Sequence, residues 1–470
     1  MAATQVYLEN EPLVNADLCK KWLFWGILWT LVFPLVGVVV SIKFNYPDWL
    51  GGTSWLTWGR IRPMHVNGVI FGAFSTTFFG LMFYMVPKLT GIRMVGEKMG
   101  YWCLWLWNIG IVMGSYSLMA GYQKGIEAGD YALWADVPLI IAFIVLTYMA
   151  IATIIKRKEK LLYIALYYLA GAMVWTAINF PLGNILLPYW VPGVNNAALH
   201  GLYIHYIVGL WITPAGLSLI YFFLPLACKN PLYSHKLSLV GFWSIALFYP
   251  FVGIHHYLYS PIPNWTQTIA IFTSMMLIIP VWTVTQNFFG TMMGNWKSLQ
   301  ESFVAKFCIM GAIFYFLGCF QGSTEALRGM QQLTHFTDFV ISHSHLTIFG
   351  TFVVWTMAGT YYVWPRVTGH ALWSRTLATW HFWLIAVSFS VMAGVLTLMG
   401  LLQGTMWADS VEFVDTVVAM KPYWFVRTLS GIGMDIGIFL FLINMYMTAV
   451  EPSPLPEVER EKALAPAAAD

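Results

Sequence analysis

Charged residues are scarce in this 470-residue sequence. Asp, Glu, Lys and Arg make up 10% of it, against roughly 25% in an ordinary soluble domain. Hydrophobic residues make up 59%, and together these values exclude a soluble globular fold. An excess of one charge sign is also missing, because 24 basic and 21 acidic residues leave a formal net charge of +3. We therefore expect no nucleic-acid partner, since such a protein needs a strongly basic surface.

Cysteine is rare as well. The sequence has five cysteines and contains neither a CxxC nor a CxxCH motif. These absences exclude a disulfide framework and covalent attachment of heme to this chain. We interpret all five as small apolar residues on helices: Cys19, Cys103, Cys228, Cys308 and Cys319.

Long apolar runs dominate the sequence. A helix of about 20 apolar residues crosses a hydrocarbon core of about 30 Å, and about twelve such runs are present. The fold class is therefore predicted to be all-α and polytopic. The first run begins only after Asp17, which favours a retained span over a cleaved signal peptide. The predicted spans are residues 18–42, 65–86, 99–121, 137–155, 161–180, 197–226, 237–258, 268–290, 307–322, 336–364, 377–402 and 429–450.

These spans are predicted to form one membrane domain, residues 18–450, after an N-terminal cytoplasmic segment, residues 1–17. The tail, residues 451–470, is rich in Pro, Ala and Glu and is predicted to be disordered. We predict no soluble domain and no internal repeat.

Basic residues in the connections predict the orientation of the chain, because Lys and Arg concentrate on the cytoplasmic side of a membrane. The connections after the even-numbered spans carry thirteen basic residues, and the alternate connections carry seven. We therefore place the first set and both termini in the cytoplasm.

Six of the eleven histidines fall at one depth, in the outer half of the membrane, once the spans are oriented in this way. A buried polar group without a partner costs about 1–3 kcal/mol, so six of them would cost on the order of 10 kcal/mol. Ligation or a dense polar network must offset this cost, and a metal or heme site is the favoured interpretation. The six are His65, His205, His255, His256, His343 and His345.

The spacing of these histidines indicates two kinds of site. His343 and His345 point to opposite faces of a helix, because two residues correspond to about 200° of rotation. One helix could thus hold a planar cofactor on each side, which suits two hemes, one with two axial imidazoles and one with an open face. His65 is a suitable partner for one of the pair, and Arg60 and Arg62 beside it could meet heme propionates or anchor the span at the interface.

The other three histidines form a set of neutral imidazoles on two helices. Three nitrogens and one open position suit copper or iron, and also zinc. His255 and His256 can bind one ion only if the helix end is distorted, and Gly253 and the following prolines favour such a distortion. Tyr249 lies nearly two turns before His256 and could deliver a proton and an electron to a gas ligand.

Five stretches carry a resemblance to a known family. They are GRIRPMHVNGVIFGAF (59–74), HYIVGLWITPAGLSLIYFFLP (205–225), PLYSHKLSLVGFW (231–243), FYPFVGIHHYLYSPIPNW (248–265) and THFTDFVISHSHLTIFG (334–350). The sequence resembles the catalytic subunit of the heme-copper oxidase superfamily, specifically of the C-type or cbb-type cytochrome c oxidases. The resemblance covers essentially all twelve spans.

The resemblance implies roles for the histidines and for Tyr249. His65 and His345 would be the axial ligands of a low-spin b-type heme, and His343 the proximal ligand of a high-spin b-type heme. The copper ligands would be His205, His255 and His256. In C-type enzymes a tyrosine at the position of Tyr249 is covalently linked to a copper ligand, here His205.

A proton pathway is also implied by the resemblance, through Thr213, Tyr233, Ser238 and Tyr249. C-type enzymes have a glutamate where this chain has Gln321, which cannot ionise, and Glu325 lies four residues further on. The remaining matches are residues near the heme propionates, namely His335 and Asp338, with Arg60 and Arg62.

The implied function is a terminal oxidase that reduces dioxygen to water and takes up or translocates protons. Since this chain has no heme-attachment motif, electrons must come from membrane-anchored c-type cytochrome subunits and a soluble cytochrome c or similar donor. The implied location is the bacterial inner membrane.

Two alternatives remain at this point. Nitric oxide reductases hold nonheme iron with a glutamate one turn after the first histidine, where this chain has Gly209, and they lack the tyrosine. A secondary transporter would explain twelve spans, and Asp435 is a mid-span acid, but transporters place their sites at the midplane between repeats.

Overall fold

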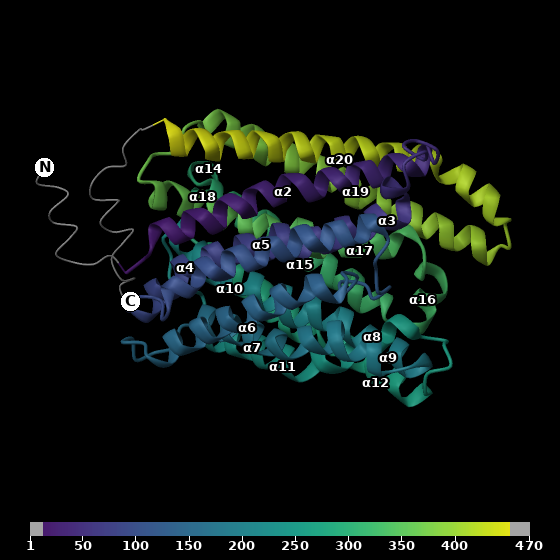
Figure 1. Ribbon diagram of the computed structural model, residues 1–470, viewed down its shortest axis with the longest axis horizontal. Helices are drawn as coiled ribbons and strands as arrows, with labels where there is room; N and C mark the ends of the chain where they lie inside the picture. Colours follow the sequence, from purple (N-terminus) through teal and green to yellow (C-terminus); the bar gives the residue numbers. More distant parts are fainter. Residues whose placement is uncertain (1–12, 452–470) are drawn as a thin grey trace, which may run out of the picture.

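The computed structural model describes residues 13–451, and the predicted all-α architecture is confirmed. Twelve helical segments are long and apolar enough to cross a membrane, and residues 13–451 contain no β-strand. Most of the predicted segment 1–17 and the predicted disordered tail lie outside the described residues. Figure 1 shows the twelve segments running roughly side by side along the long axis of the molecule.

Six spans are single α-helices and six combine shorter elements. The single helices are α2 (Ala16–Asn45), α5 (Glu97–Ala120), α6 (Leu133–Ile155), α15 (Phe303–Glu325), α19 (Arg375–Ala408) and α20 (Phe413–Val450). The composite spans are α3 (Trp58–Asn67), η2 (Gly68–Ser75) and α4 (Thr76–Thr90); α7 (Ile164–Pro181), η3 (Leu182–Leu186) and α8 (Leu187–Trp190); α9 (Gly193–Tyr206), η4 (Ile207–Ile212) and α10 (Thr213–Cys228); α11 (His235–Phe248) and η5 (Tyr249–Tyr257); α12 (Asn264–Met276) and α13 (Ile278–Met292); and α17 (Asp338–Thr347), η6 (Ile348–Val353) and α18 (Val354–Thr368). Short helices η1 (Ser54–Leu56), α14 (Ser298–Glu301) and α16 (Arg328–Thr334) lie in connections.

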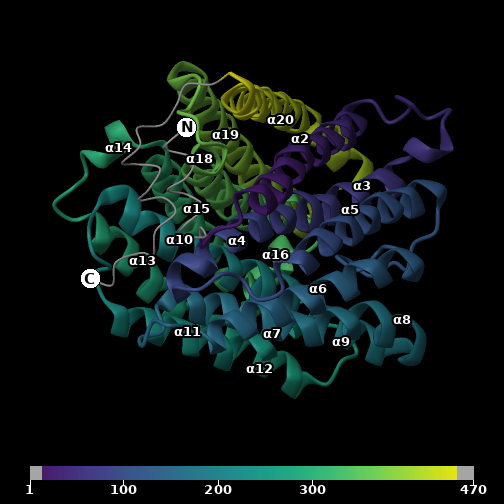
Figure 2. The same ribbon diagram turned by 60° about the vertical axis from the view of Figure 1, so that its left-hand side comes forward.

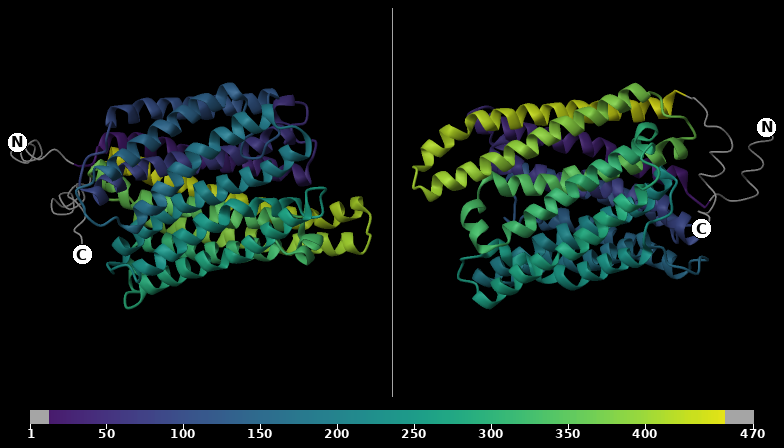
Figure 3. Two further views of the ribbon diagram at one scale, coloured as in Figure 1. Left: turned by 90° about the horizontal axis from the view of Figure 1, so that it is seen from below. Right: turned by 180° about the vertical axis from the view of Figure 1, so that it is seen from behind.

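The last span begins earlier than predicted. We expected it at residue 429, but α20 begins at Phe413. The charges of Lys421 and Arg427 interrupt the hydropathy pattern, yet neither charge nor Pro422 ends the helix here. With α19, α20 forms a hairpin that extends past the other helices at the end opposite the start of α2 (Figures 1 and 3).

The second, sixth and tenth spans form the centre of the bundle. Their most apolar stretches are 100%, 94% and 89% buried, whereas no other span exceeds 67%. In each, a helix carrying a histidine is followed by a π-helical segment, η2, η4 or η6, and these three segments contact one another. The same plan thus occurs in the three central spans. π-Helical turns of this kind are frequent at functional sites.

The outer helices surround this centre on two sides. Figure 2 shows α2, α19 and α20 along one edge and α7, α11 and α12 along the opposite edge. In Figure 1 the start of α2 and the end of α20 lie at the same end of the bundle, as an even number of spans requires. The labels α3, α9 and α17, which mark the helices carrying four of the six histidines, lie toward the other end.

Candidate metal centre

Three histidines converge in the bundle. His205 lies on α9, and His255 and His256 lie on η5. One nitrogen of each lies within 4.8 Å of a nitrogen of the others. Their ring centroids are separated by 4.5 Å for His205 and His255 and by 4.7 Å for each of the other two pairs. The arrangement therefore presents three neutral nitrogen donors to one point, as a copper, iron or zinc ion requires.

A local change of helix type brings the two adjacent histidines to this point. The seventh span changes from an α-helix to a 3₁₀ helix at Tyr249, so the expected distortion of this end is present. Gly253 allows η5 to approach α9, because a Cβ atom at this position would lie 2.2 Å from the carbonyl oxygen of Gly201. Any larger residue at Gly253 would push the two helices apart.

The nitrogen atoms in this cluster fit a metal ion. Nε2 of His205 faces Nε2 of His255 at 2.8 Å, while Nε2 of His256 and Nδ1 of His205 are buried without a hydrogen-bond partner. Buried polar atoms are nearly always paired. A cation bound between the rings would use these lone pairs.

His343 lies across a small cavity from this cluster. The cavity, of about 60 Å³, is lined by His205, Tyr249, His255, Cys319 and His343 among others. Nδ1 of His343 donates to the carbonyl of Gly318 at 2.9 Å. This bond fixes the proton on Nδ1 and leaves Nε2 as the free donor.

Tyr249 occupies the space beside His205. The ring centroids of the two residues are 5.9 Å apart. A Cβ atom on Gly209 would lie 1.7 Å from Cε1 of Tyr249. A side chain at position 209 is thus incompatible with the tyrosine, so a glutamate of the nitric oxide reductase kind has no space here.

His65 and His345 face each other on α3 and α17. Their ring planes are inclined by 25° and their centroids lie 6.3 Å apart. Nδ1 of His65 donates to the carbonyl of Phe33, and Nδ1 of His345 donates to that of Ile341, each at 2.8 Å. With both Nδ1 atoms anchored, both Nε2 atoms are free, which fits an axial pair on one heme iron.

The predicted propionate residues lie in different settings. Arg60 donates to the carbonyl of Met119 at 2.9 Å, and Arg62 pairs with Glu127 at 2.8 Å, so both already have protein partners. The ring of His335 stacks on that of Phe336, and burial lowers the pKa of His335.

Asp338 pairs with Arg427, which the sequence did not predict as a site residue. It accepts hydrogen bonds from Gln403 and Trp424 at 2.9 and 3.1 Å, and its carboxylate lies 3.8 Å from the guanidinium of Arg427. The pair places Arg427 beside the start of α17, the helix that carries His345. Its side chain is 11% exposed, and its Nη1 has no hydrogen-bond partner. Arg427 is far from His65 and His345 in the sequence, so no spacing pattern connects it with them.

The predicted proton-pathway residues lie along α10 and α11. Tyr233 is 53% exposed near the start of α11, at the end of the bundle away from the histidines. Ser238 is buried, and its carbonyl accepts from Tyr168 at 3.3 Å. The ring of Tyr168 stacks on that of Tyr221. These two tyrosines were not among the predicted residues.

Thr213 lines the same cavity as Tyr249, and its hydroxyl donates to the carbonyl of Val208 at 2.9 Å. Gln321 lies apart from these residues, since its amide nitrogen donates to Thr397 of α19 at 2.9 Å. The residue that packs against the ring of His343 is its neighbour Gly322.

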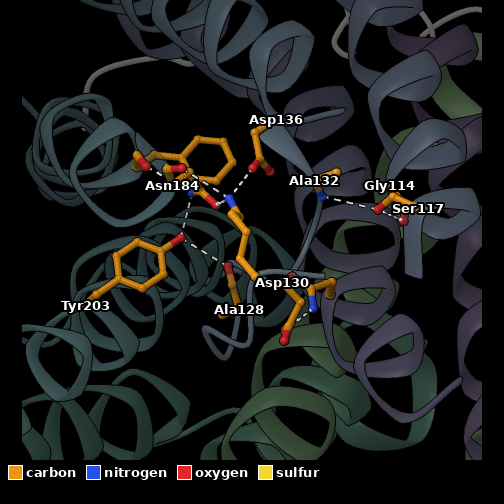
Figure 4. A network of polar contacts seen from close by, with 11 residues as sticks. Gly114, Ser117, Ala128, Asp130, Ala132, Asp136, Asn184 and Tyr203 are labelled. Carbon is orange, nitrogen blue, oxygen red and sulfur yellow. Dashed lines mark hydrogen bonds and ion pairs between the residues drawn. The ribbon is translucent and has the colours of Figure 1, made fainter. Parts of the chain in front are cut away.

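A buried charge network reaches the helices that carry His65 and His205. Lys124 in the connection between α5 and α6 pairs with Asp136 and donates to Asn184, and Asn184 in turn donates to the hydroxyl of Tyr203 (Figure 4). Burial lowers the pKa of Lys124. Burial also raises the pKa of Asp130 to about 6, although Asn67, two residues after the histidine on α3, donates to its carboxylate at 2.7 Å.

The fold and the clustered histidines are those of a membrane-embedded subunit with a candidate metal centre. Residues 17–433 match the model of the family described as "Cytochrome C and Quinol oxidase polypeptide I", and the chain belongs to this family. The family implies heme and copper cofactors. The expected subunit I of a C-type terminal cytochrome c oxidase is thereby confirmed, and the transporter alternative is excluded.

Individual relatives agree with this assignment. The chain is 28% identical to the "Cytochrome c oxidase subunit 1 homolog, bacteroid" of Bradyrhizobium diazoefficiens over 94% of this chain and 83% of the relative. It is 26% identical to the cbb3-type cytochrome c oxidase subunit CcoN1 of Stutzerimonas stutzeri over 93% and 95%. A heme-copper terminal oxidase dimer solved by cryo-electron microscopy has the same fold, with a TM-score of 0.74 and 16% identity over 97% of this chain and 87% of that one.

Proposed function

We propose that this subunit reduces dioxygen to water at a centre formed by one high-spin b-type heme and one copper ion. His343 would hold the heme and the three-histidine cluster the copper, while His65 and His345 would hold a second, low-spin b-type heme. The observation that carries the proposal is the shared cavity, which His343 lines together with His205, His255 and Tyr249.

The roles of the residues follow from this geometry. When bound, the heme iron and copper supply electrons and coordination positions for dioxygen. The chain's own residues would hold these groups, the heme through His343 Nε2 and the copper through the three clustered imidazoles. Tyr249 is placed to provide a proton and an electron from its phenol.

Copper is favoured over nonheme iron at the three-histidine cluster. The ring of Tyr249 occupies the space that a glutamate at position 209 would need. The cluster therefore offers three imidazoles and no carboxylate, and imidazole nitrogen suits copper well. This contact favours the oxidase over a nitric oxide reductase.

Arg427 supports the placement of the hemes. Its Nη1 lies 3.8 Å from Asp338, at the start of the helix that carries His345, and makes no hydrogen bond. A guanidinium in such a position suits a carboxylate. We assign Arg427, with Asp338 holding it, to a heme propionate, in preference to Arg60 and Arg62, which are already engaged.

Protons are proposed to enter from the side of the chain termini. Tyr233 is exposed there, and Ser238, Tyr168, Tyr221 and Thr213 continue toward Tyr249. Since the metal centre lies in the opposite half of the bundle, proton uptake by this route would move charge across the membrane.

Electrons are proposed to come from membrane-anchored c-type cytochrome subunits of the same complex, themselves reduced by a soluble cytochrome c or similar carrier. We place the complex in a bacterial inner membrane, with both termini of this chain in the cytoplasm. The excess of basic residues in the connections on that side supports this orientation.

Single-ligand variants test the proposal. His65→Ala should lose the low-spin heme spectrum, His343→Ala should lose carbon monoxide binding to the high-spin heme, and His256→Ala should lose copper with both heme spectra retained. Optical spectra and elemental analysis of the purified complexes measure these outcomes. Loss of the same centre in all three variants would contradict the assignment.

A further inference from the structure

Ser274 is the residue of α12 that contacts the three-histidine cluster through a side-chain hydrogen bond. It is 2% exposed, and its Oγ lies 2.7 Å from Nδ1 of His255. The same hydroxyl lies 2.6 Å from the carbonyl oxygen of Ala270, one turn earlier. A hydroxyl has one hydrogen, and a carbonyl can only accept. Ser274 therefore donates to Ala270 and accepts the N–H of His255 Nδ1.

This bond fixes the tautomer of His255. With its proton on Nδ1, the ring presents an unprotonated Nε2, and this atom points at Nε2 of His205. Without an acceptor at Nδ1, the imidazole could carry its proton on Nε2 and donate it to His205. The two histidines would then be joined by a hydrogen bond between their Nε2 atoms, and no metal ion would be needed to pair these atoms.

The other ligand candidates lack a comparable side-chain contact in residues 13–451. Nδ1 of His65, of His343 and of His345 each donates to a backbone carbonyl. Nδ1 of His205 has no partner. Among the ligand candidates, His255 is thus the one whose Nδ1 is held by a side-chain atom, the Oγ of Ser274.

Ser274 also joins the two walls of the cavity. Its carbonyl accepts from the hydroxyl of Ser323 on α15 at 3.3 Å. The same helix provides the Gly318 carbonyl that anchors His343. The hydrogen bonds that orient His255 and His343 therefore both involve α15, directly for His343 and through Ser274 for His255.

We propose that Ser274 is a positioning residue for the copper ion, because it holds His255 as the Nδ1–H tautomer with Nε2 directed into the three-histidine cluster. This inference rests on the proposed function and adds a residue that acts only through His255. Residues that orient metal ligands typically contribute 10–100-fold to metal affinity.

The test is a copper titration of the purified complex. Copper is removed with a chelator, and copper per heme is then measured by elemental analysis over a range of buffered free copper concentrations. Ser274→Ala removes the acceptor, and Ser274→Thr retains a hydroxyl. Ser244→Ala is the matched control, since Ser244 makes the same bond to the carbonyl one turn earlier, at 2.7 Å, on an exposed part of α11.

We expect Ser274→Ala to need about 10–100-fold more free copper for half-occupancy, while Ser274→Thr and Ser244→Ala stay near the wild type. Equal occupancy in Ser274→Ala and wild type would overturn the inference, as would an equal loss in Ser244→Ala. If the Ser274→Ala complex does not accumulate in the membrane, the Ser274→Thr complex decides. A copper affinity near that of the wild type supports the positioning role, and a loss of copper affinity overturns it.

Failure of the proposed function has a different signature. A wild-type complex that holds nonheme iron in place of copper contradicts the oxidase centre. The same titration is then carried out with iron. The ratio of the free iron concentrations at half-occupancy, Ser274→Ala over wild type, still decides whether Ser274 positions His255.

Discussion

An anchored Nδ1 does not by itself distinguish the proposed heme ligands from an ordinary core histidine. His65, His343 and His345 each anchor Nδ1 on a carbonyl and leave Nε2 free. His381 is more completely buried than these three, its Nδ1 is bonded to the hydroxyl of Tyr361, and its Nε2 is also without a partner. Aromatic rings surround it, and it has no ring contact with another histidine in residues 13–451. Convergence of several rings, more than burial, marks the site.

Tyr249 should be needed for chemistry and not for assembly. Tyr249→Phe removes the phenolic proton, and we expect the rate of oxygen consumption to fall by about 10²–10⁴-fold, as for other proton donors. Heme spectra and copper content should stay unchanged. Tyr206→Phe is the control, because its hydroxyl donates to the carbonyl of Pro250 in the same region. An active Tyr249→Phe complex would remove this residue from the mechanism.

Gly209 should tolerate no side chain. In Gly209→Ala the new methyl group would meet the ring of Tyr249, and overpacking of this kind costs about 1–3 kcal/mol. We expect a displaced tyrosine and a lower rate of oxygen reduction, with hemes retained. Gly394→Ala on α19 serves as the control, since a Cβ atom there meets nothing within 4 Å. Equal activity of the two variants would show that the tyrosine position is not critical.

At this scale the sequence predicted which histidines converge but not what supports them. Depth and spacing made His65 a partner for one of the pair His343 and His345, and the resemblance selected His345. Arg427 and Ser274 could not be predicted, because their partners are distant in sequence and hydrogen bonds between helices depend on packing. Gln321 was expected near the proton pathway, yet it points to α19, since the helix turns by about 100° between it and Gly322.

At the scale of elements, the composite spans build the site. A π-helical segment follows the histidine-bearing helix in each of the three central spans, and a 3₁₀ helix carries His255 and His256. Apolar periodicity predicted where the spans lie because it reports burial. It could not show these changes of helix type, which arise from contacts such as that of Gly253 with Gly201.

The buried pair of Lys124 and Asp136 should hold the α5–α6 connection in place. Their side chains are 6% and 2% exposed. Lys124→Met leaves a buried carboxylate unpaired, which costs about 3–5 kcal/mol. The double variant with Asp136→Leu should recover most of this loss. The midpoint of thermal loss of heme absorbance measures the effect.

Lys21→Met is the matched comparison for this prediction. Lys21 and Asp17 form an ion pair in which both side chains are more than half exposed, and such pairs contribute about 0–1 kcal/mol. A Lys124→Met complex as stable as Lys21→Met would show that the connection does not depend on its buried charge.

At the scale of the whole molecule, twelve spans place both ends of the described chain on one side. Which side this is follows only from the distribution of basic residues. The sequence therefore predicted the number of spans, because hydropathy is a local property of each segment. The orientation stays a prediction.

Thiol labelling from outside the cell tests this orientation. Ser410→Cys in the α19–α20 connection should react with a membrane-impermeant reagent, whereas Lys158→Cys after α6 should react only in opened cells. Both positions are exposed. Wild-type protein is the blank, because four of its five cysteines are buried. The reverse pattern would invert the proposed route of protons.

The central claim is the composition of the metal centre, and one preparation tests it most directly. A reduced-minus-oxidised optical spectrum of the purified complex, combined with elemental analysis, counts the hemes and metals associated with this subunit after the c-type hemes of its partners are subtracted. We predict two b-type hemes, one low-spin and one high-spin, and one copper ion for each copy of this chain. Two heme irons with one nonheme iron and no copper would contradict the account.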